Sequence, residues 1–420
     1  ASAAAGPPRV ILGRDTRESG PVIEAALVEG LETGGARADR AGVITTPGIA
    51  CLVRLLGYDA GIVISASHNP YRDNGIKVFA AGGDKLPDEA EAEIERLVLD
   101  GAPAVRPADA GGGARPPAAP EELAAHYLDW LREAAGRPLS IKGRRVVLDC
   151  AHGAASILGP LAFRAAGAEV VPFHCAPDGR NINEKCGALH MEALAAEVVR
   201  TRAALGLAFD GDADRCLVAD ASGRILSGDH VLFLAARDLQ ERGRLRGDGV
   251  VGTVMSNLWL ERALAGRGIA LRRAPVGDKY VLEEMRREGY VLGGEQSGHV
   301  IFLEKAATGD GLLTGLLLLE LLDRTGIDLA AWAASVHPFP QILVNVPVRE
   351  RPPLMAHPAI GPAIRREEEQ LGRRGRLLVR YSGTEPQARI MVEGETAALV
   401  EASVARLTSV IQKAIGRDPT

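Results

Sequence analysis

Three aspartates stand at alternate positions directly after a short apolar run. The segment reads GLAF followed by DGDADR, in which single small residues separate Asp210, Asp212 and Asp214. Carboxylates at this spacing repel one another unless a cation neutralises them, and oxygen ligands favour a hard divalent ion such as Mg²⁺ over zinc. A calcium EF-hand does not fit, because the loop positions that require Gly and Glu hold Arg215 and Ala221. The spacing predicts a magnesium site, and a solvated acidic turn is the alternative.

The segment ISASHNP, residues 64–70, carries a serine and a histidine side by side after another strand-like run. Neighbouring residues rarely face each other and the G-x-S-x-G motif is absent, so we do not expect Ser67 and His68 to act as a hydrolase pair. The functional alternative is a loop serine that exchanges phosphate while a nearby Mg²⁺ neutralises the phosphoryl oxygens. A capped turn at Asn69-Pro70 is the structural alternative.

A third segment, GGEQSGH at residues 293–299, gathers Glu295, Ser297 and His299 between glycines. A carboxylate, a hydroxyl and an imidazole suit the hydroxyl groups of a sugar, and the imidazole can also transfer a proton near neutral pH. The segment therefore indicates sugar binding, with a glycine-rich hairpin that binds nothing as the alternative.

A fourth segment, RYSGTEPQAR at residues 380–389, is rich in hydrogen-bond donors. Arg380, Ser382, Thr384 and the amides around Gly383 form a set that suits a doubly charged phosphate. No Walker A motif is present, and no G-x-G-x-x-G motif opens a helix, so nucleotide binding is poorly supported.

Two cations accompany these groups in the sequence. Arg215 either balances the acidic charge beside it or binds a phosphate near the metal. Lys77, in DNGIKVF, is typical of a surface lysine when taken alone. Because the net charge of the 420-residue chain is -5, an anionic substrate has to be held by local positive charge of this kind.

The elements that position the four segments follow a regular order. Strand-like runs alternate with helical segments of about ten to fifteen residues, which is typical of parallel βαβ units, until a tail of α+β character begins. The expected strands include 9–13, 59–65, 144–150, 249–255 and 269–273, and the expected helices include 191–202, 256–265, 279–287, 358–371 and 396–415. Residues 102–120 are expected to form a loop, and residues 136–143 a linker.

This rhythm predicts three similar α/β domains with mixed sheets and a smaller C-terminal α+β domain. We place the domains at residues 1–138 (serine loop), 139–243 (acidic loop), 244–339 (sugar loop) and 340–420 (phosphate loop). At roughly 100–200 residues per domain, the length allows about two to four domains.

Composition excludes several classes of function. The small negative charge favours neither nucleic acid nor an anionic membrane as a partner. The best membrane candidate, residues 312–322, falls short of the ~20 apolar residues that a bilayer span needs. The start of the chain has no basic segment followed by a long apolar one, so no secretory signal is expected. Five widely spaced cysteines without a C-x-x-C motif indicate reduced thiols and a cytoplasmic location.

Taken together, SASHNP, DGDADR, GEQSGH and RYSGTEPQAR resemble the four loops of the α-D-phosphohexomutase superfamily. NINEKCG, GTVMSNL, VGDKYVLEEM and TGDGLLT are also similar to its glucosamine branch. The resemblance covers nearly the whole chain, from about Arg9 to Arg406. It implies four domains around a central cleft, each contributing one loop, and is compatible with a homodimer.

The resemblance also implies a reaction, the interconversion of glucosamine 6-phosphate and glucosamine 1-phosphate through a phosphoserine and a bisphosphorylated sugar. Phosphorylated Ser67 and the three aspartates would hold Mg²⁺. Lys77 and His299 would be the acid and base candidates, with His68 and Arg215 beside the reacting phosphate. The sugar would contact residues of the third segment, and its other phosphate would contact residues of the fourth; the implied set is Glu295, Ser297, His299, Arg380, Ser382, Gly383, Thr384 and Arg389.

The chain differs from the superfamily pattern at a few places. ASAAAGPP precedes GRDTR where superfamily members have a strand and a T-D-G-x-R-G-like segment, so we expect a shortened first domain. Ala188-Leu189, Tyr381 and Lys279 replace the Ser-Thr, Pro and Arg that are common there. Three alternatives stay open: a mannose or glucose mutase of the same superfamily, a metal-dependent phosphatase, and a sugar-phosphate binding protein without catalysis.

Overall fold

A computed structural model describes residues 6–101, 117–136, 144–382 and 385–417. Gly383, Thr384, most of the expected loop at 102–120 and most of the expected linker at 136–143 lie outside this part. The chain divides into two compact units. The first comprises Ala1–Thr253 and Ala274–Ala334, and the second comprises Val254–Arg273 and Ser335–Thr420.

The first sheet of the first unit has the strand order β2-β1-β3-β4. Its elements are β1 (Arg9–Arg14), α1 (Gly20–Thr33), β2 (Arg37–Val43), α2 (Thr46–Leu56), β3 (Ala60–Ile64), β4 (Ile76–Ala80) and α3 (Asp88–Asp100). The strand β1 pairs in parallel with β2 and β3, whereas β3 and β4 form an antiparallel hairpin. The serine segment is the connection of that hairpin. The helix α2 packs against β1 and β3, and Thr45 caps its N-terminus through its hydroxyl.

The second sheet has the order β6-β5-β7-β8-β9. Its elements are α4 (Pro120–Ala135), β5 (Arg145–Asp149), α5 (Ala155–Ala165), β6 (Glu169–Phe173), η1 (Gly187–Leu189), α6 (Met191–Thr201), β7 (Leu205–Phe209), β8 (Cys216–Asp220) and β9 (Ile225–Leu226). The strand β5 lies parallel to β6 and β7, and β7 turns back antiparallel into β8. The acidic segment forms this turn. All five residues of β7 are buried, which fits the position of the strand inside the sheet.

A third group of strands completes the first unit. Its elements are α7 (Gly228–Glu241), η2 (Arg246–Asp248), β10 (Gly249–Thr253), α9 (Asp278–Glu288), β12 (Leu292–Gly294), β13 (Val300–Phe302), α10 (Gly311–Thr325) and α11 (Leu329–Ser335), the last of which ends at the unit boundary. The strand β10 is parallel to β12, and β12 is antiparallel to β13, so that the third segment forms their hairpin loop. The apolar run expected to be too short for a bilayer belongs to α10, in which all leucines but the half-buried Leu317 are buried. None of the helices in the described ranges combines the length and apolar character that a membrane span requires.

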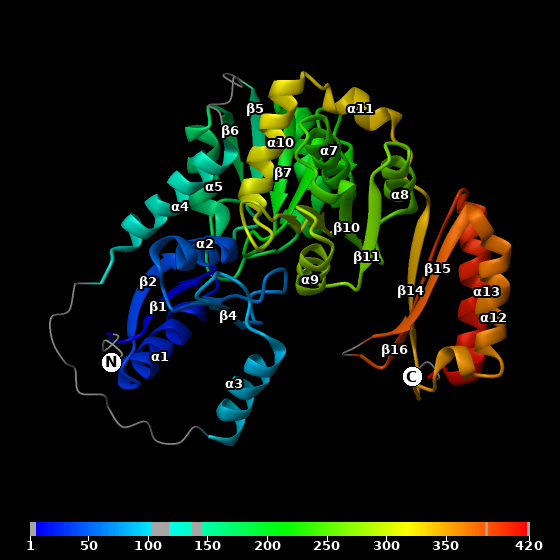
Figure 1. Ribbon diagram of the computed structural model, residues 1–420, viewed down its shortest axis with the longest axis horizontal. Helices are drawn as coiled ribbons and strands as arrows, with labels where there is room; N and C mark the ends of the chain where they lie inside the picture. Colours follow the sequence, from blue (N-terminus) through cyan, green and yellow to red (C-terminus); the bar gives the residue numbers. More distant parts are fainter. Residues whose placement is uncertain (1–5, 102–116, 137–143, 383–384, 418–420) are drawn as a thin grey trace. The chain divides into compact units, whose positions relative to one another are not determined.

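The second unit contains α8 (Leu258–Ala265), most of β11 (Ala270–Ala274), β14 (Gln341–Pro347), η3 (Leu354–Ala356), α12 (Ile360–Leu371), η4 (Gly372–Arg374), β15 (Gly375–Tyr381), β16 (Gln387–Gly394) and α13 (Ala397–Ile415). The strands β14, β16 and β15 form an antiparallel sheet in that order. The helices α12 and α13 cover one face of this sheet, as Figure 1 shows. Buried Val400, Leu407 and Ile411 of α13 pack there against Ile390 and Val392 of β16. This is the expected small α+β module.

The strand pairing explains how the sequence rhythm relates to the fold. Parallel pairs occur in all three α/β groups, and an antiparallel strand follows each of them, which gives the expected mixed sheets. The helices expected at 191–202, 279–287 and 396–415 are α6, α9 and α13, with ends within one residue.

Candidate active site

The three aspartates converge in the tight turn between β7 and β8. Ala213 takes a left-handed φ of 57°, and its amide donates to the Asp210 carbonyl, which closes the turn. One carboxylate oxygen from each of Asp210, Asp212 and Asp214 lies within 4.8 Å of the others, and all three residues are buried. Within the part of the chain that the structure describes, buried Asp212 Oδ1 and Asp214 Oδ1 have no hydrogen-bond partner. An unpaired buried oxygen is costly, so these atoms fit a cation that would accept their lone pairs.

The charges around this turn also indicate a cation. Burial and then the neighbouring Asp214 and Asp212 charges raise the pKa of Asp210 well above its usual range. Burial would also raise the pKa of Asp212, but the Lys77 ammonium, whose Nζ lies 2.6 Å from Asp212 Oδ2, outweighs this effect and lowers it. Burial would lower the pKa of Lys77, and the acidic charges instead raise it. One ammonium thus compensates one of three buried acids by direct contact, which leaves negative charge for a divalent ion.

Ser67 lies directly against this acidic turn. Its Oγ donates a hydrogen bond to Asp210 Oδ2 over 2.7 Å, although 143 residues separate the two in the chain. Its backbone φ is 49°, in the left-handed region. Gly211 makes the approach possible, since a Cβ there would lie 2.4 Å from the Ser67 carbonyl oxygen. The expected meeting of the serine with the acidic loop is therefore present.

His68 and Arg215 flank the serine and the aspartates. His68 Nδ1 lies 3.3 Å from Ser67 Oγ, so the expectation that these adjacent side chains do not face each other is wrong. The left-handed turn at Ser67 brings the two together. Burial and then the Arg215 charge lower the pKa of His68, which favours its neutral form at neutral pH. Arg215 Nε lies 3.9 Å from Asp210 Oδ2 and 3.8 Å from Asp214 Oδ1, which is too long for a hydrogen bond.

Backbone bonds join the third segment to the acidic turn. Arg215 pairs with His299 in an antiparallel bridge, and the Cys216 amide donates to the Gly298 carbonyl over 3.0 Å. Glu295 is 8% exposed; its Oε1 accepts from the Gly277 amide over 2.9 Å, and its Oε2 accepts from the Ser297 hydroxyl over 3.3 Å. The carboxylate is thus already oriented within its loop.

The His299 side chain is almost completely enclosed by protein. It is 2% exposed, and its Nε2 accepts from the Gly309 amide over 3.2 Å. Its Nδ1 is buried without a hydrogen-bond partner among the described residues. The histidine is close to the other site residues, and its role as acid or base stays a prediction.

The fourth segment belongs to the second unit. Arg380 of β15 and Arg389 of β16 stand directly opposite each other in the antiparallel ladder. Burial and then the Arg389 charge lower the pKa of Arg380. Arg389 Nε is buried without a hydrogen-bond partner among the described residues, and another nitrogen of its guanidinium lies 3.5 Å from the Glu385 carboxylate. Two like charges on facing positions are unfavourable alone and become favourable when an anion binds both.

Ser382 extends this donor group. Its amide donates to the Gln387 carbonyl over 2.9 Å, and its Oγ accepts from the Glu385 amide over 3.3 Å, so the turn holds the hydroxyl near the end of β15. Gly383 and Thr384, the other two expected phosphate contacts, lie outside the described residues.

Three further residues at the site were not predicted from the sequence. Thr46 Oγ1 donates to Asp212 Oδ2 over 2.6 Å. The Asn183 side-chain amide donates to the carbonyls of Ser67 and Asn69 over 2.9 and 3.0 Å. Arg17 is completely buried; it pairs with Asp15 over 2.9 Å and donates to four carbonyls of the serine segment, those of Ser67, Asn69, Pro70 and Asp73. The signal for Arg17 was GRDTR directly after a strand, and Asn183 lies in the NINEKCG segment of the resemblance without a role assigned to it, whereas nothing in the sequence marked Thr46.

Comparison with known families accounts for nearly the whole chain. Four domains described as phosphoglucomutase/phosphomannomutase match in order: alpha/beta/alpha domain I over residues 1–103, domain II over 125–223, domain III over 227–339 and the C-terminal domain over 343–409. Among solved structures, a phosphoglucomutase/phosphomannomutase family protein from Burkholderia thailandensis aligns with a TM-score of 0.78 at 25% identity, covering 97% of this chain and 89% of that one.

Curated relatives are closer in sequence. The chain is 52% identical to the phosphoglucosamine mutase of Moorella thermoacetica over 389 residues, which are 92% of this chain and 86% of that protein. It is 48% identical to the phosphoglucosamine mutase of Solibacter usitatus, covering 97% of this chain and 90% of that protein. The fold is also that of the Aspergillus fumigatus N-acetylphosphoglucosamine mutase solved with GlcNAc-6P and magnesium, with a TM-score of 0.66 at 20% identity over 88% of this chain and 92% of that one. By these matches the chain belongs to the phosphoglucomutase/phosphomannomutase family, within the α-D-phosphohexomutase superfamily.

Proposed function

We propose that the protein is a mutase that interconverts glucosamine 6-phosphate and glucosamine 1-phosphate through a phosphorylated Ser67. The observation that carries the proposal is the 2.7 Å contact between Ser67 Oγ and Asp210 Oδ2, inside a buried group of three aspartates. A serine that only capped a turn would not need a carboxylate cluster built around its hydroxyl. The curated relatives at 48–52% identity support glucosamine phosphate as the substrate.

The transfer moves one phosphoryl group in each direction. The P–O bond to Ser67 Oγ breaks, a P–O bond to a sugar hydroxyl forms, and the proton of that hydroxyl is taken up by a base. The bisphosphorylated sugar then returns its other phosphate to Ser67 Oγ by the reverse chemistry, and the freed sugar oxygen is protonated. Uncatalysed phosphate-ester hydrolysis is so slow that accelerations of up to about 10²¹-fold are known, so charge neutralisation at this position is the main task of the site.

Asp210, Asp212, Asp214 and the phosphate of Ser67 would hold Mg²⁺. The oxygen-only donor set and the two unpaired carboxylate oxygens fit this ion. When bound, Mg²⁺ supplies positive charge that stabilises the phosphoryl oxygens.

The other site residues of the first unit would transfer protons, bind the phosphoryl group or bind the sugar. Lys77 is held protonated by its acidic neighbours and is one candidate for proton transfer; His299 is the other. Arg215 carries a guanidinium beside the acids without a short ion pair, so it is available to a phosphoryl oxygen. His68 touches the nucleophilic oxygen and orients it. Glu295 and Ser297 would bind sugar hydroxyls.

In the second unit, Arg380, Ser382 and Arg389 are proposed as the clamp for the phosphate that does not react, together with Gly383 and Thr384. The facing arginines of β15 and β16 support this role, because two adjacent cations on a rigid ladder bind a dianion without much reorganisation.

The first test replaces the phosphate carrier. Ser67→Ala removes the oxygen that carries phosphate and should abolish mutase turnover, whereas the fold should persist because the hydroxyl is not part of the apolar core. Intact-mass spectrometry of the purified wild type should detect one added phosphate, and the variant should lack it. Assays with glucosamine 1-phosphate and mannose 1-phosphate should show faster conversion of the glucosamine compound.

Ser409→Ala, an exposed serine of α13, is the matched control and should keep both the phosphate and the activity. Circular dichroism of all three proteins checks the fold. Turnover at the wild-type rate in Ser67→Ala would disprove the phosphoserine mechanism, and release of free phosphate without isomerisation would replace the mutase by a phosphatase.

A further inference from the structure

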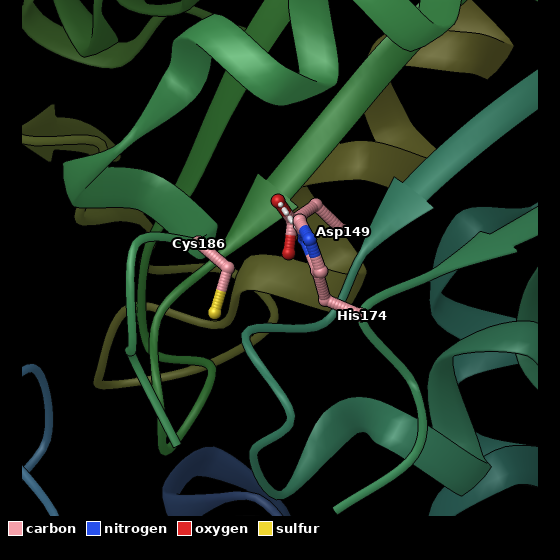
Figure 2. A group of neighbouring side chains, drawn as sticks. All are labelled: Asp149, His174 and Cys186. Atoms are coloured by element: carbon pink, nitrogen blue, oxygen red, sulfur yellow. Dashed lines mark hydrogen bonds and ion pairs between the residues drawn. The ribbon is translucent and has the colours of Figure 1, made fainter. Parts of the chain in front are cut away.

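Three metal-binding side chains meet at the carboxyl edge of the second sheet, and none of them has a task in the proposed reaction. Asp149 is the last residue of β5, His174 directly follows β6, and Cys186 directly precedes η1. Figure 2 shows the carboxylate against the imidazole, with Cys186 beside them on a separate segment. One donor atom from each lies within 4.8 Å of the other two.

The cluster is buried but has an opening. Asp149 is 0% and Cys186 1% exposed, whereas the His174 side chain is 23% exposed and gives a route to solvent. His174 Nδ1 lies 2.9 Å from Asp149 Oδ2, the contact that is dashed in Figure 2. This contact fixes the orientation of the imidazole relative to the carboxylate.

Backbone amides hold the carboxylate in place. The Ala151 amide donates to Asp149 Oδ1 over 2.9 Å, and the Gly187 amide donates to Asp149 Oδ2 over 3.0 Å. A carboxylate has about four lone-pair sites, so these two bonds and the imidazole leave capacity for one more partner. The carboxylate is therefore rigid and still able to bind a cation.

The donor types decide which cation fits. One sulfur, one nitrogen and one oxygen suit zinc and similar borderline ions, whereas Mg²⁺ prefers oxygen alone. Tetrahedral bonds of ~2.0–2.3 Å place ligand atoms ~3.3–3.8 Å apart, between the 2.9 Å contact of His174 with Asp149 and the 4.8 Å limit of the group, so small side-chain rotations suffice to reach them. Three protein ligands leave a fourth position for water or another small ligand.

We propose that Asp149, His174 and Cys186 bind one zinc-like divalent cation, at a site that shares no donor with the acidic turn. The bound cation links β5, β6 and the segment 176–187. That segment carries Asn183, whose amide contacts the carbonyls of Ser67 and Asn69, so occupancy of the site steadies the support of the serine loop.

The test uses Co²⁺ as a spectroscopic substitute for zinc, added to the full-length protein with Mg²⁺ in excess. Burial, and then the Asp149 charge, raise the pKa of Cys186 to about 12, so its thiol stays protonated without a cation. One equivalent of Co²⁺ should produce the near-ultraviolet thiolate-to-cobalt charge-transfer band and the intense visible bands of tetrahedral cobalt. Zinc should abolish both. The oxygen ligands of the acidic turn cannot give the thiolate band.

Variants assign the ligands. Cys186→Ser should lose the thiolate band, and His174→Gln should weaken cobalt binding by at least about tenfold. Cys51→Ser, which removes another buried free thiol, should keep the wild-type spectrum. Zinc should also raise the thermal midpoint of the wild type and of Cys51→Ser, but not that of Cys186→Ser.

Two results would overturn the proposal: no thiolate band in the wild type, or a band that survives in Cys186→Ser. The nearby Cys175, whose thiol donates to the Phe173 carbonyl over 3.2 Å, would be the ligand in the second case, and Cys175→Ser would reveal it. The Ser67→Ala protein separates this proposal from the mutase proposal, because it should lack turnover and still give the cobalt spectrum.

Discussion

Asn183 shows how a residue without catalytic chemistry can set the position of a nucleophile. Its side-chain amide donates to the Ser67 and Asn69 carbonyls, while its own backbone has a left-handed φ of 60°. Because the bonds go to backbone oxygens, they hold the loop and leave the Ser67 hydroxyl free for Asp210. The Asn183 amide therefore positions Ser67 through its backbone, whereas Asp210 contacts its hydroxyl.

Replacing this amide tests the positioning. Asn183→Gly keeps the left-handed backbone, which glycine adopts without strain, and removes both hydrogen bonds. Each bond is worth about 1 kcal/mol net, so we expect kcat to fall by roughly ten- to thirtyfold, with a small change in KM. Steady-state kinetics with glucosamine 1-phosphate measure both constants.

Lys185→Gly is the matched control, because Lys185 lies in the same segment, is exposed and has a φ of 54°. It should leave kcat unchanged. An equal loss in both variants would mean that loop flexibility, rather than the Asn183 amide, controls the rate.

The residue scale also shows why part of the site was predictable. Asp210, Asp212 and Asp214 lie in one short turn, so their sequence spacing already contains their geometry. Thr46 and Asn183 reach their partners across 166 and 116 residues, and such contacts depend on the packing of two sheets that no local pattern describes.

At the scale of elements, Asp310 joins two helices of the first unit. It caps α10 by accepting from the Leu313 amide over 2.9 Å, and it accepts from the Tyr127 hydroxyl of α4 over 2.8 Å. Asp310 is 2% exposed, and burial raises its pKa to about 6 from an ordinary value of 3.8. The cost of burying the charge thus exceeds the gain from its hydrogen bonds.

This shift predicts a pH dependence of stability. Between about pH 4 and pH 6 the folded protein keeps the Asp310 proton and the unfolded chain has lost it, so the Asp310 contribution to stability falls as the pH rises through that window. Two pKa units correspond to about 3 kcal/mol. Asp310→Asn preserves the cap and cannot ionise, so thermal midpoints measured from pH 4 to pH 7 should show the variant gaining on the wild type as pH rises.

The comparison with Asp310→Asn cancels the titration of all other groups that the two proteins share. A parallel pH profile for both proteins would show that Asp310 titrates with an ordinary pKa.

Many of the helices and strands could be predicted from the sequence, and the edge strand β4 could not. Long helices such as α13 follow from their apolar period, and buried strands such as β7 from their uninterrupted apolar residues. The strand β4 was not expected, because its burial pattern mixes exposed and half-buried residues and only Phe79 is buried in the core. Edge strands obtain their structure from the neighbouring strand, here β3, rather than from their own sequence.

At the scale of the whole molecule, the proposed metal should act on stability as well as on rate. A ligand that binds only the folded state, at a hundred times its Kd, stabilises that state by about 2.7 kcal/mol. We expect Mg²⁺ to raise the thermal midpoint of the protein by about 3 °C, and EDTA to reverse the effect. Scanning calorimetry over a Mg²⁺ titration measures the shift.

Asp212→Asn should abolish most of this shift, and Glu401→Gln, which changes an exposed acid of α13, should retain it. If Asp212→Asn responded to Mg²⁺ as the wild type does, the ion would be binding elsewhere.

The sequence pattern and the family matches give the same number and order of domains. The boundaries after residues 138, 243 and 339 stay predictions. The alternation of strands and helices in the sequence gives the number of elements, but it does not show where the core of one domain ends and the next begins. Resolving those boundaries requires limited proteolysis or separately expressed pieces.

The left-handed backbone at Ser67 has a consequence for how this chain can evolve. A threonine carries the same hydroxyl, but its branched Cβ is strongly disfavoured at a φ of 49°. Threonine at this position would therefore keep the reactive oxygen and strain the backbone. The shape of the main chain, and not only the reactive oxygen, favours serine over threonine here.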